Sequence, residues 1–129
     1  MHWIAAVALL ALLEYMIFGY IVGAARVRYK VAAPAVVGHP VFERAFRVHY
    51  NTLELLVIFV PALWLFGLYL SPRVGALVGV AFVIGRALYA AGYLRAPEKR
   101  EVGAGISFLC VAVLLFGALF GVVRLLWAT

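Results

Sequence analysis

The sequence predicts an all-α integral membrane protein, an up-and-down bundle of four transmembrane helices, and three observations support this prediction. Of the 129 residues, 68% are hydrophobic and only 12% are charged, which is too little polar surface for a water-soluble globule. The apolar residues gather in four runs, each close to the ~20 residues that a helix needs to cross a bilayer. The runs also lack the alternation of polar and apolar residues that is typical of membrane β-barrels.

The first run, Ile4–Gly23, is expected to be a retained transmembrane helix rather than a cleaved signal peptide. It opens with MHWIAAVALL, holds Glu14 midway, and meets its basic residues only afterwards. A signal peptide would begin with basic residues and end at a small-residue cleavage site. The connection that follows, KVAAPAVVGHP, contains two prolines and a glycine, so we expect it to be non-helical.

The second and third runs, Leu53–Leu70 and Val74–Tyr93, are separated by a turn of only a few residues. Such a short turn makes the two helices antiparallel neighbours. The fourth run, Val102–Trp127, contains the single cysteine, Cys110, which excludes an intramolecular disulfide and is expected to be a small, unreactive core or lipid-facing residue. We therefore expect one four-helix transmembrane domain over residues 1–129. Glycines four residues apart, Gly75 with Gly79 and Gly117 with Gly121, predict close helix packing.

The basic residues are unevenly distributed along the chain. Nine of the eleven fall near the first and third connections, and only Arg73 and Arg124 lie toward the other side. By the positive-inside rule, the first and third connections face the cytoplasm and both termini lie on the opposite side. This topology accounts for much of the net charge of +6, and no basic-aromatic surface for nucleic acid is recognisable.

A polar cluster, FERAFRVHYNTLELL, leads into the second apolar run. Wound as a helix at about 100° per residue, it places five polar side chains on one stripe: Glu43, Arg44, Arg47, Asn51 and Glu54. His49 and Thr52 point elsewhere. Such a stripe is unfavourable in a membrane unless its members face protein, water or a ligand. One interpretation is a ladder that anchors the helix, in which Arg47 pairs with Glu43 and Asn51. The other is a binding site.

The end of the third run favours the binding site. Arg86, Tyr89 and Tyr93 share one helix face, and antiparallel packing brings this end to the same membrane side as the polar stripe. Arginine binds carboxylates through paired donors, and tyrosine hydroxyls add uncharged donors. Asn51 and Glu54 supply acceptors for an amine or an amide. The combination predicts a small anionic ligand with carboxylates, an amine and amide bonds, and glutathione is one such molecule.

The blocks FERAFRVHYNTLE and RALYAAGYLRAPEKR resemble those of the membrane-associated proteins in eicosanoid and glutathione metabolism, the MAPEG superfamily. The resemblance extends over nearly the whole chain in length and helix order. It implies a homotrimer in which glutathione, the co-substrate, binds between neighbouring subunits near the cytoplasmic ends of the helices, with no metal. It also implies conjugation of glutathione to apolar electrophiles that arrive from the bilayer, a detoxification activity, and leaves open reduction of lipid hydroperoxides.

The resemblance also assigns roles to single residues. It implies that Arg100 is the catalytic residue, because its family counterpart holds the glutathione thiolate, and a fixed cation favours that ionised form. Arg86 is expected to pair with a ligand carboxylate or with Glu54. His49 occupies a position that contacts glutathione in some relatives. The remaining expected glutathione contacts are Arg26, Arg47, Asn51, Glu54, Tyr89 and Tyr93. Val27, Leu55 and the position of Pro61 depart from the leukotriene C4 synthase pattern and count against leukotriene synthesis.

Two alternatives remain open. Glu14, alone in the first helix, resembles the glutamate of small multidrug resistance transporters, which exchanges protons with a cationic drug. The excess of arginine would repel such cargo, and Glu14 could instead pair with Arg124 or Tyr15. The second alternative is a trimeric membrane adaptor of the same fold without catalysis.

Overall fold

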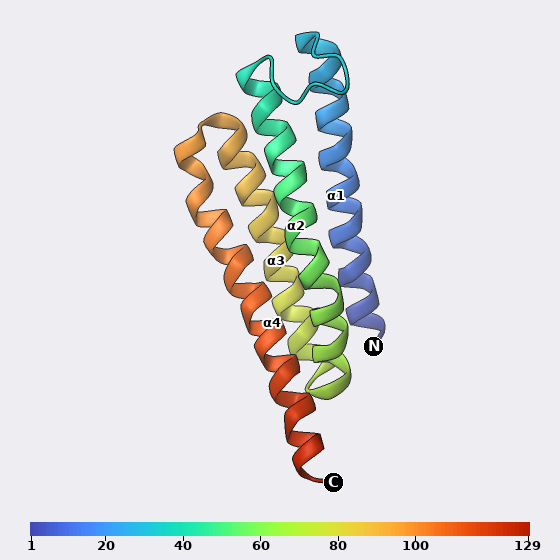
Figure 1. Ribbon diagram of the computed structural model, residues 1–129. Coiled ribbons are helices and arrows are strands. Elements are labelled where there is room, and N and C mark those ends of the chain that lie inside the picture. Colours follow the sequence, from blue (N-terminus) through green and yellow to red (C-terminus); the bar gives the residue numbers. More distant parts are fainter.

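The computed structural model describes all 129 residues and confirms the predicted all-helical fold. Helix α1 spans His2–Tyr29, α2 Pro40–Tyr69, α3 Pro72–Arg95 and α4 Glu101–Trp127, and a short 3-10 helix, η1, occupies Pro97–Arg100 (Figure 1). The α1, α2 and α3 helices, and the η1–α4 segment as a whole, are long and apolar enough to cross a membrane. Four such helices indicate a multi-pass membrane protein.

The helices run up and down, as the sequence predicts. Figure 1 shows the α1–α2 connection and η1 at one end of the bundle, and both termini with the α2–α3 turn at the other. We call the end that carries residues 30–39 and η1 the basic end. The assignment of this end to the cytoplasm stays a prediction.

Local signals fix where the helices begin and end. The His39 side chain accepts a hydrogen bond from the Val41 N–H (3.2 Å), and Pro40 begins α2 directly after it. Ser71 caps α3 in the same way through the Val74 N–H (3.3 Å), again before a proline. These caps satisfy backbone donors that have no partner inside the helix. The α2 helix therefore begins well before the apolar run at Leu53 and includes the whole polar stripe.

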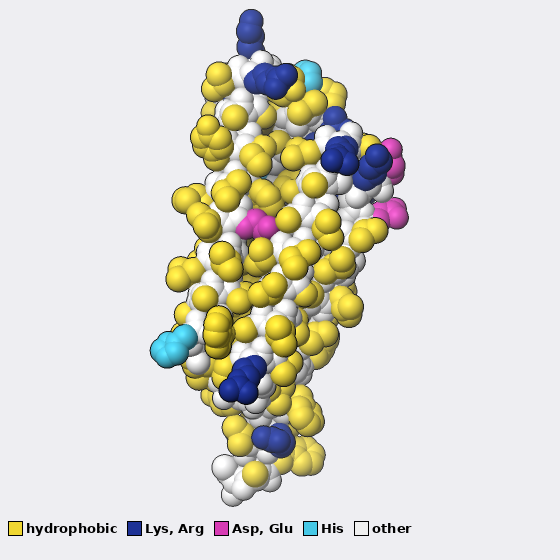
Figure 2. Space-filling model, turned by 180° about the vertical axis from the view of Figure 1, so that it is seen from behind, with side chains coloured by type: hydrophobic (Ala, Val, Ile, Leu, Met, Phe, Trp, Pro, Cys, Tyr) yellow, Lys and Arg dark blue, Asp and Glu magenta, His cyan; other side chains and the backbone are white.

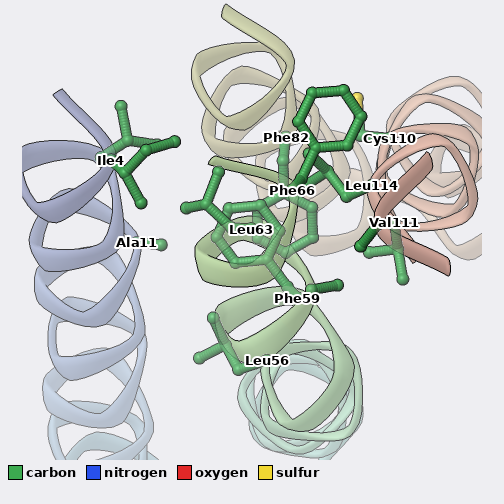
Figure 3. Packing of buried hydrophobic residues seen from close by; sticks show 13 residues of the cluster. Ile4, Ala11, Leu56, Phe59, Leu63, Phe66, Phe82, Cys110, Val111 and Leu114 are labelled. Carbon is green, nitrogen blue, oxygen red and sulfur yellow. The ribbon is translucent and has the colours of Figure 1, made fainter. Parts of the chain in front are cut away.

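A hydrophobic core joins all four helices along the bundle. Phe59 of α2 and Phe82 of α3 stack at its centre, with ring centroids 3.9 Å apart, and both are fully buried. Ile4 and Ala11 of α1 approach this centre from one side, and Leu114 of α4 from the other (Figure 3). Cys110 is buried in the same cluster, which agrees with its expected role as a small core residue.

Glycines allow the helices to approach closely, as their spacing predicts. A Cβ on Gly75 would meet Ile4, and one on Gly79 would meet Val7, so α1 packs against these two glycines of α3. Gly117 and Gly121 of α4 lie in the same way against Phe66 and Tyr69 of α2, which assigns α2 as their partner. A further contact joins α3 to α4 at Gly103. A side chain at that position would collide with the backbone of Tyr89 and with the Gly85 carbonyl oxygen.

The outer surface is apolar over most of its length. Large hydrophobic side chains such as Leu9, Phe108 and Phe116 are at least 66% exposed in the single chain. Figure 2 shows a hydrophobic surface with cationic side chains toward its two ends. This distribution suits a bilayer, where cationic side chains sit at the headgroups and apolar ones face the hydrocarbon.

We expect Gly103→Ala to lower the free energy of unfolding by about 1–3 kcal/mol, because the new methyl group must displace the α3 backbone. Gly105→Ala is the matched control in the same helix, since a Cβ there meets nothing within 4 Å. Thermal unfolding in detergent measures both. Equal stability of the two variants would contradict the close α3–α4 approach.

Candidate functional site

A fully buried arginine lies at the centre of the polar cluster. Arg86 of α3 is 0% exposed, and its Nε and Nη2 both donate to the Thr52 hydroxyl of α2, at 3.2 and 2.9 Å. Nη2 also donates to Asn51 Oδ1 at 2.9 Å. The side chain of Arg86 therefore bonds two consecutive residues of α2 and fixes the register of α3 against that helix.

Thr52 is a site residue that the sequence analysis missed. Its hydroxyl donates to the Val48 carbonyl oxygen (2.7 Å), which leaves the oxygen lone pairs free to accept from Arg86. The helical wheel correctly turns Thr52 away from the polar stripe. The wheel could not show that the side of α2 that carries Thr52 faces α3. A hydroxyl on the inward face of a transmembrane helix is the signal that would have found it.

An alternating array of cations and phenol rings extends from Arg86 toward the basic end. The Arg86 guanidinium lies 4.2 Å from the centroid of the Tyr89 ring, and the Tyr89 and Tyr93 rings stack with centroids 5.6 Å apart. The Arg100 guanidinium then lies 5.5 Å from the centroid of the Tyr93 ring. We call Arg86, Tyr89, Tyr93 and Arg100 the Arg–Tyr array. Cation–π contacts of this kind stabilise the orientation of both partners.

The structure thus brings together four residues that the sequence analysis placed in one site. The shared helix face of Arg86, Tyr89 and Tyr93 is present, and η1 carries Arg100 back onto it. Where η1 packs against the end of α3, the Lys99 carbonyl lies so close to Gly92 that a side chain at position 92 would not fit. The position of Arg100 is therefore set by backbone contact as well as by its own side chain.

The polar stripe of α2 contributes to this site unequally. Asn51 is half-buried and bonds Arg86, whereas Arg47 and Glu54 are exposed in the single chain. The Arg47 guanidinium lies 6.0 Å from the centroid of the Tyr50 ring on the same helix. Arg86 bonds Asn51 and Thr52 rather than Glu54, and Asn51 accepts from Arg86 rather than from Arg47. The ladder interpretation therefore finds no support at Asn51.

Two predicted ligand contacts lie away from the Arg–Tyr array. Arg26 donates to the carbonyl oxygens of Val31 (3.3 Å) and Ala35 (2.7 Å), with its guanidinium 4.7 Å from the centroid of the Phe42 ring. It closes the α1–α2 connection. A ligand contact by Arg26 stays a prediction.

His49 stacks on Tyr15 of α1, with ring centroids 4.4 Å apart, and packs against Gly19. It lies in the α1–α2 seam, in agreement with its direction on the helical wheel. Its contact with glutathione also stays a prediction.

Glu14 does not make the pairings expected for it. Its Oε1 is buried without a hydrogen-bond partner, so neither Tyr15 nor Arg124 satisfies that atom.

The site offers guanidinium groups and phenols in a largely apolar setting. Exposed Arg47 and Arg100 are free to bind carboxylates of a ligand. Buried Arg86 fixes the positions of Asn51 and Tyr89 through its hydrogen bond and its ring contact. The arrangement suits a small acid with several polar groups, bound near the membrane boundary.

Comparison with known proteins gives a family match and several relatives of this chain. The model of the MAPEG family matches residues 4–120. An uncharacterised protein of Synechocystis is 44% identical over 93% of this chain and 88% of its own length. Human microsomal glutathione S-transferase 2 is 41% identical over 90% of this chain and 80% of its own. Bovine leukotriene C4 synthase is 32% identical over the same shares, 90% and 80%.

We expect Thr52→Val to lower the free energy of unfolding by about 1–3 kcal/mol, because it leaves the Arg86 Nε without an acceptor. Thr52→Ser keeps the hydroxyl and should retain most of the stability. Chemical or thermal unfolding in detergent compares the two variants. If valine and serine behaved alike, the hydroxyl would not be the anchor of Arg86.

Proposed function

The chain belongs to the MAPEG family, and on that premise we propose that it is a membrane glutathione transferase that conjugates glutathione to apolar electrophiles. The Arg–Tyr array, held against Asn51 by Arg86, is the single observation that carries the proposal. The names of two relatives, microsomal glutathione S-transferase 2 and leukotriene C4 synthase, support it.

We propose that glutathione binds across the Arg–Tyr array and the stripe of α2. Its two carboxylates suit the guanidinium groups of Arg47 and Arg100, which are exposed and able to donate in pairs. Its amine suits the exposed carboxylate of Glu54, and its amides suit Asn51 and the phenol of Tyr93. Each polar group of the peptide thus has a candidate of complementary chemistry within or beside the array.

We assign the catalytic role to Arg100. Its cation favours the thiolate of glutathione, which is the nucleophile, over the thiol. Lowering the thiol pKa from about 8.5 by two units requires about 2.7 kcal/mol of differential stabilisation, which one well-placed cation in a partly dry site supplies. With a nitro-halobenzene, the thiol proton passes to water, sulfur bonds the ring carbon, and the halide leaves with the electron pair of its bond.

We further propose a homotrimer with the glutathione site between subunits. Arg47 and Glu54 are charged, lie in a transmembrane helix, and are exposed in the single chain. Such residues are rarely in contact with lipid. A neighbouring subunit that covers this stripe would give both charges a polar environment and would complete the site around the ligand.

The second substrate is proposed to be apolar and to enter from the bilayer. A groove of about 270 Å³ between α2 and α4 offers an apolar lining for part of it; Pro61, Leu65 and Leu119 are among the lining residues. The basic end, with the glutathione site, is proposed to face the cytoplasm.

We expect Arg100→Ala to reduce kcat/KM for a nitro-halobenzene by about a hundredfold, because the thiolate loses its cation. Arg100→Lys should recover part of the activity. Lys99→Ala is the matched control, an exposed cation in the same short helix, and should leave activity unchanged. Stopped-flow detection of the thiolate absorbance would follow the same order. Full activity of Arg100→Ala would refute the catalytic assignment and leave the binding site untested by this variant alone.

We expect Arg47→Ala to weaken glutathione binding by roughly tenfold, the loss of one charge-assisted contact. Arg73→Ala, at the opposite end of the bundle, is the control and should bind as the unchanged protein does. Isothermal titration in detergent measures both. Unchanged affinity in Arg47→Ala would exclude this residue from the site. Binding without turnover of any electrophile would favour the adaptor alternative.

A further inference from the structure

Three buried side-chain atoms have no hydrogen-bond partner: Arg44 Nε near the start of α2, and two atoms deeper in the bundle that belong to side chains of opposite charge. One of these two is Oε1 of Glu14 on α1, and the other is Nη1 of Arg86 on α3. Helices α1 and α3 run in the same direction, with Ile4 against Gly75 and Val7 against Gly79. Glu14 and Arg86 each follow the Val7–Gly79 contact by seven residues, so they lie at the same level of the bundle, although these two atoms form no direct hydrogen bond. Unsatisfied buried polar atoms are rare in native proteins, so a shared partner for the two is expected.

The positive charge of Arg86 also requires a partner inside the protein. Thr52 and Asn51 satisfy its Nε and Nη2, but both are neutral acceptors. Glu14 is the only acidic residue of α1, and the register of α1 against α3 places it at the level of Arg86. A guanidinium that is 0% exposed in a transmembrane helix needs a counter-ion as well as acceptors. Glu14 fits this role by position and by charge.

A water molecule can accept from one group and donate to another, and buried waters commonly join polar atoms that would otherwise lack partners. We propose that Glu14 is the counter-ion of Arg86, joined to it by one buried water between Oε1 and Nη1, and that it is a positioning residue of the glutathione site. Only the positioning role in the glutathione site rests on the proposed function.

The positioning effect passes through Arg86. With Nη1 held toward α1, the guanidinium plane is fixed, and Nη2 and Nε meet Asn51 and Thr52 while the same group lies over the Tyr89 ring. Without the counter-ion, the guanidinium is free to reorient toward other acceptors, and Asn51 loses its fixed partner. The site then has to be ordered when glutathione binds, which lowers affinity.

Glu14→Gln tests the inference with little change of shape, because glutamine keeps the size and a hydrogen-bonding oxygen but removes the charge. We expect the glutathione Kd to rise roughly tenfold while KM for the electrophile stays unchanged. Leu13→Val, an exposed neighbour on α1, is the control and should change neither. A role in stability alone would lower the unfolding midpoint without moving the Kd, so an unchanged Kd for Glu14→Gln overturns the positioning role.

A structure of the protein in lipid or detergent, at a resolution that shows ordered water, tests the pair independently of glutathione. Density for one water within hydrogen-bond distance of both Glu14 Oε1 and Arg86 Nη1 supports the inference. Contact of these two atoms without water, or their separation by apolar side chains, overturns it. If the unchanged protein binds no glutathione, the proposed function fails, and this structural experiment still decides whether the water-bridged pair exists.

Discussion

A guanidinium group buried among transmembrane helices must find polar partners inside the protein, and much of this structure depends on how Arg86 meets that requirement. The group cannot reach the headgroups, because it is fully enclosed by the bundle. Its bonds to Asn51 and Thr52 tie α3 to α2 at one defined register. The same side chain lies over Tyr89, so the phenol rings that follow along α3 take their orientation from it.

Close helix packing makes these polar contacts reproducible. Glycines at the α1–α3, α3–α4 and α2–α4 contacts let the backbones approach until side chains on one helix meet the backbone of the next. In lipid, such packing replaces much of the hydrophobic driving force that stabilises soluble bundles. The Phe59–Phe82 stack adds a rigid contact between α2 and α3, the same two helices that Arg86 joins. Polar and apolar contacts therefore fix one geometry.

Much of the fold and part of the site could be predicted from the sequence. The four helices follow from apolar length, and the common face of Arg86, Tyr89 and Tyr93 follows from helical spacing, since both are properties of single segments. Thr52 was missed because the direction in which a residue meets another helix is a tertiary property. The carbonyl groups that Arg26 binds could not be predicted, because they belong to an irregular connection whose path no periodicity encodes. Its ligand contact stays a prediction.

The exposed charges of α2 show a further limit. The sequence places Arg47 and Glu54 on one stripe of α2. The role of that stripe can be assigned only when the molecule that packs against it is known. In a single chain both residues remain exposed. Their environment depends on what packs against α2 in the membrane, and therefore on association, which local sequence patterns do not encode.

The tight passage from α3 to α4 constrains how the chain can change over evolutionary time. Because η1 has only four residues and its Lys99 carbonyl lies against Gly92, an inserted or deleted residue there would rotate Arg100 away from Tyr93. The connection at residues 30–39 has no such restriction, apart from the carbonyl groups that Arg26 binds. Length variation among family members should accordingly accumulate in the first connection and be purged from the third.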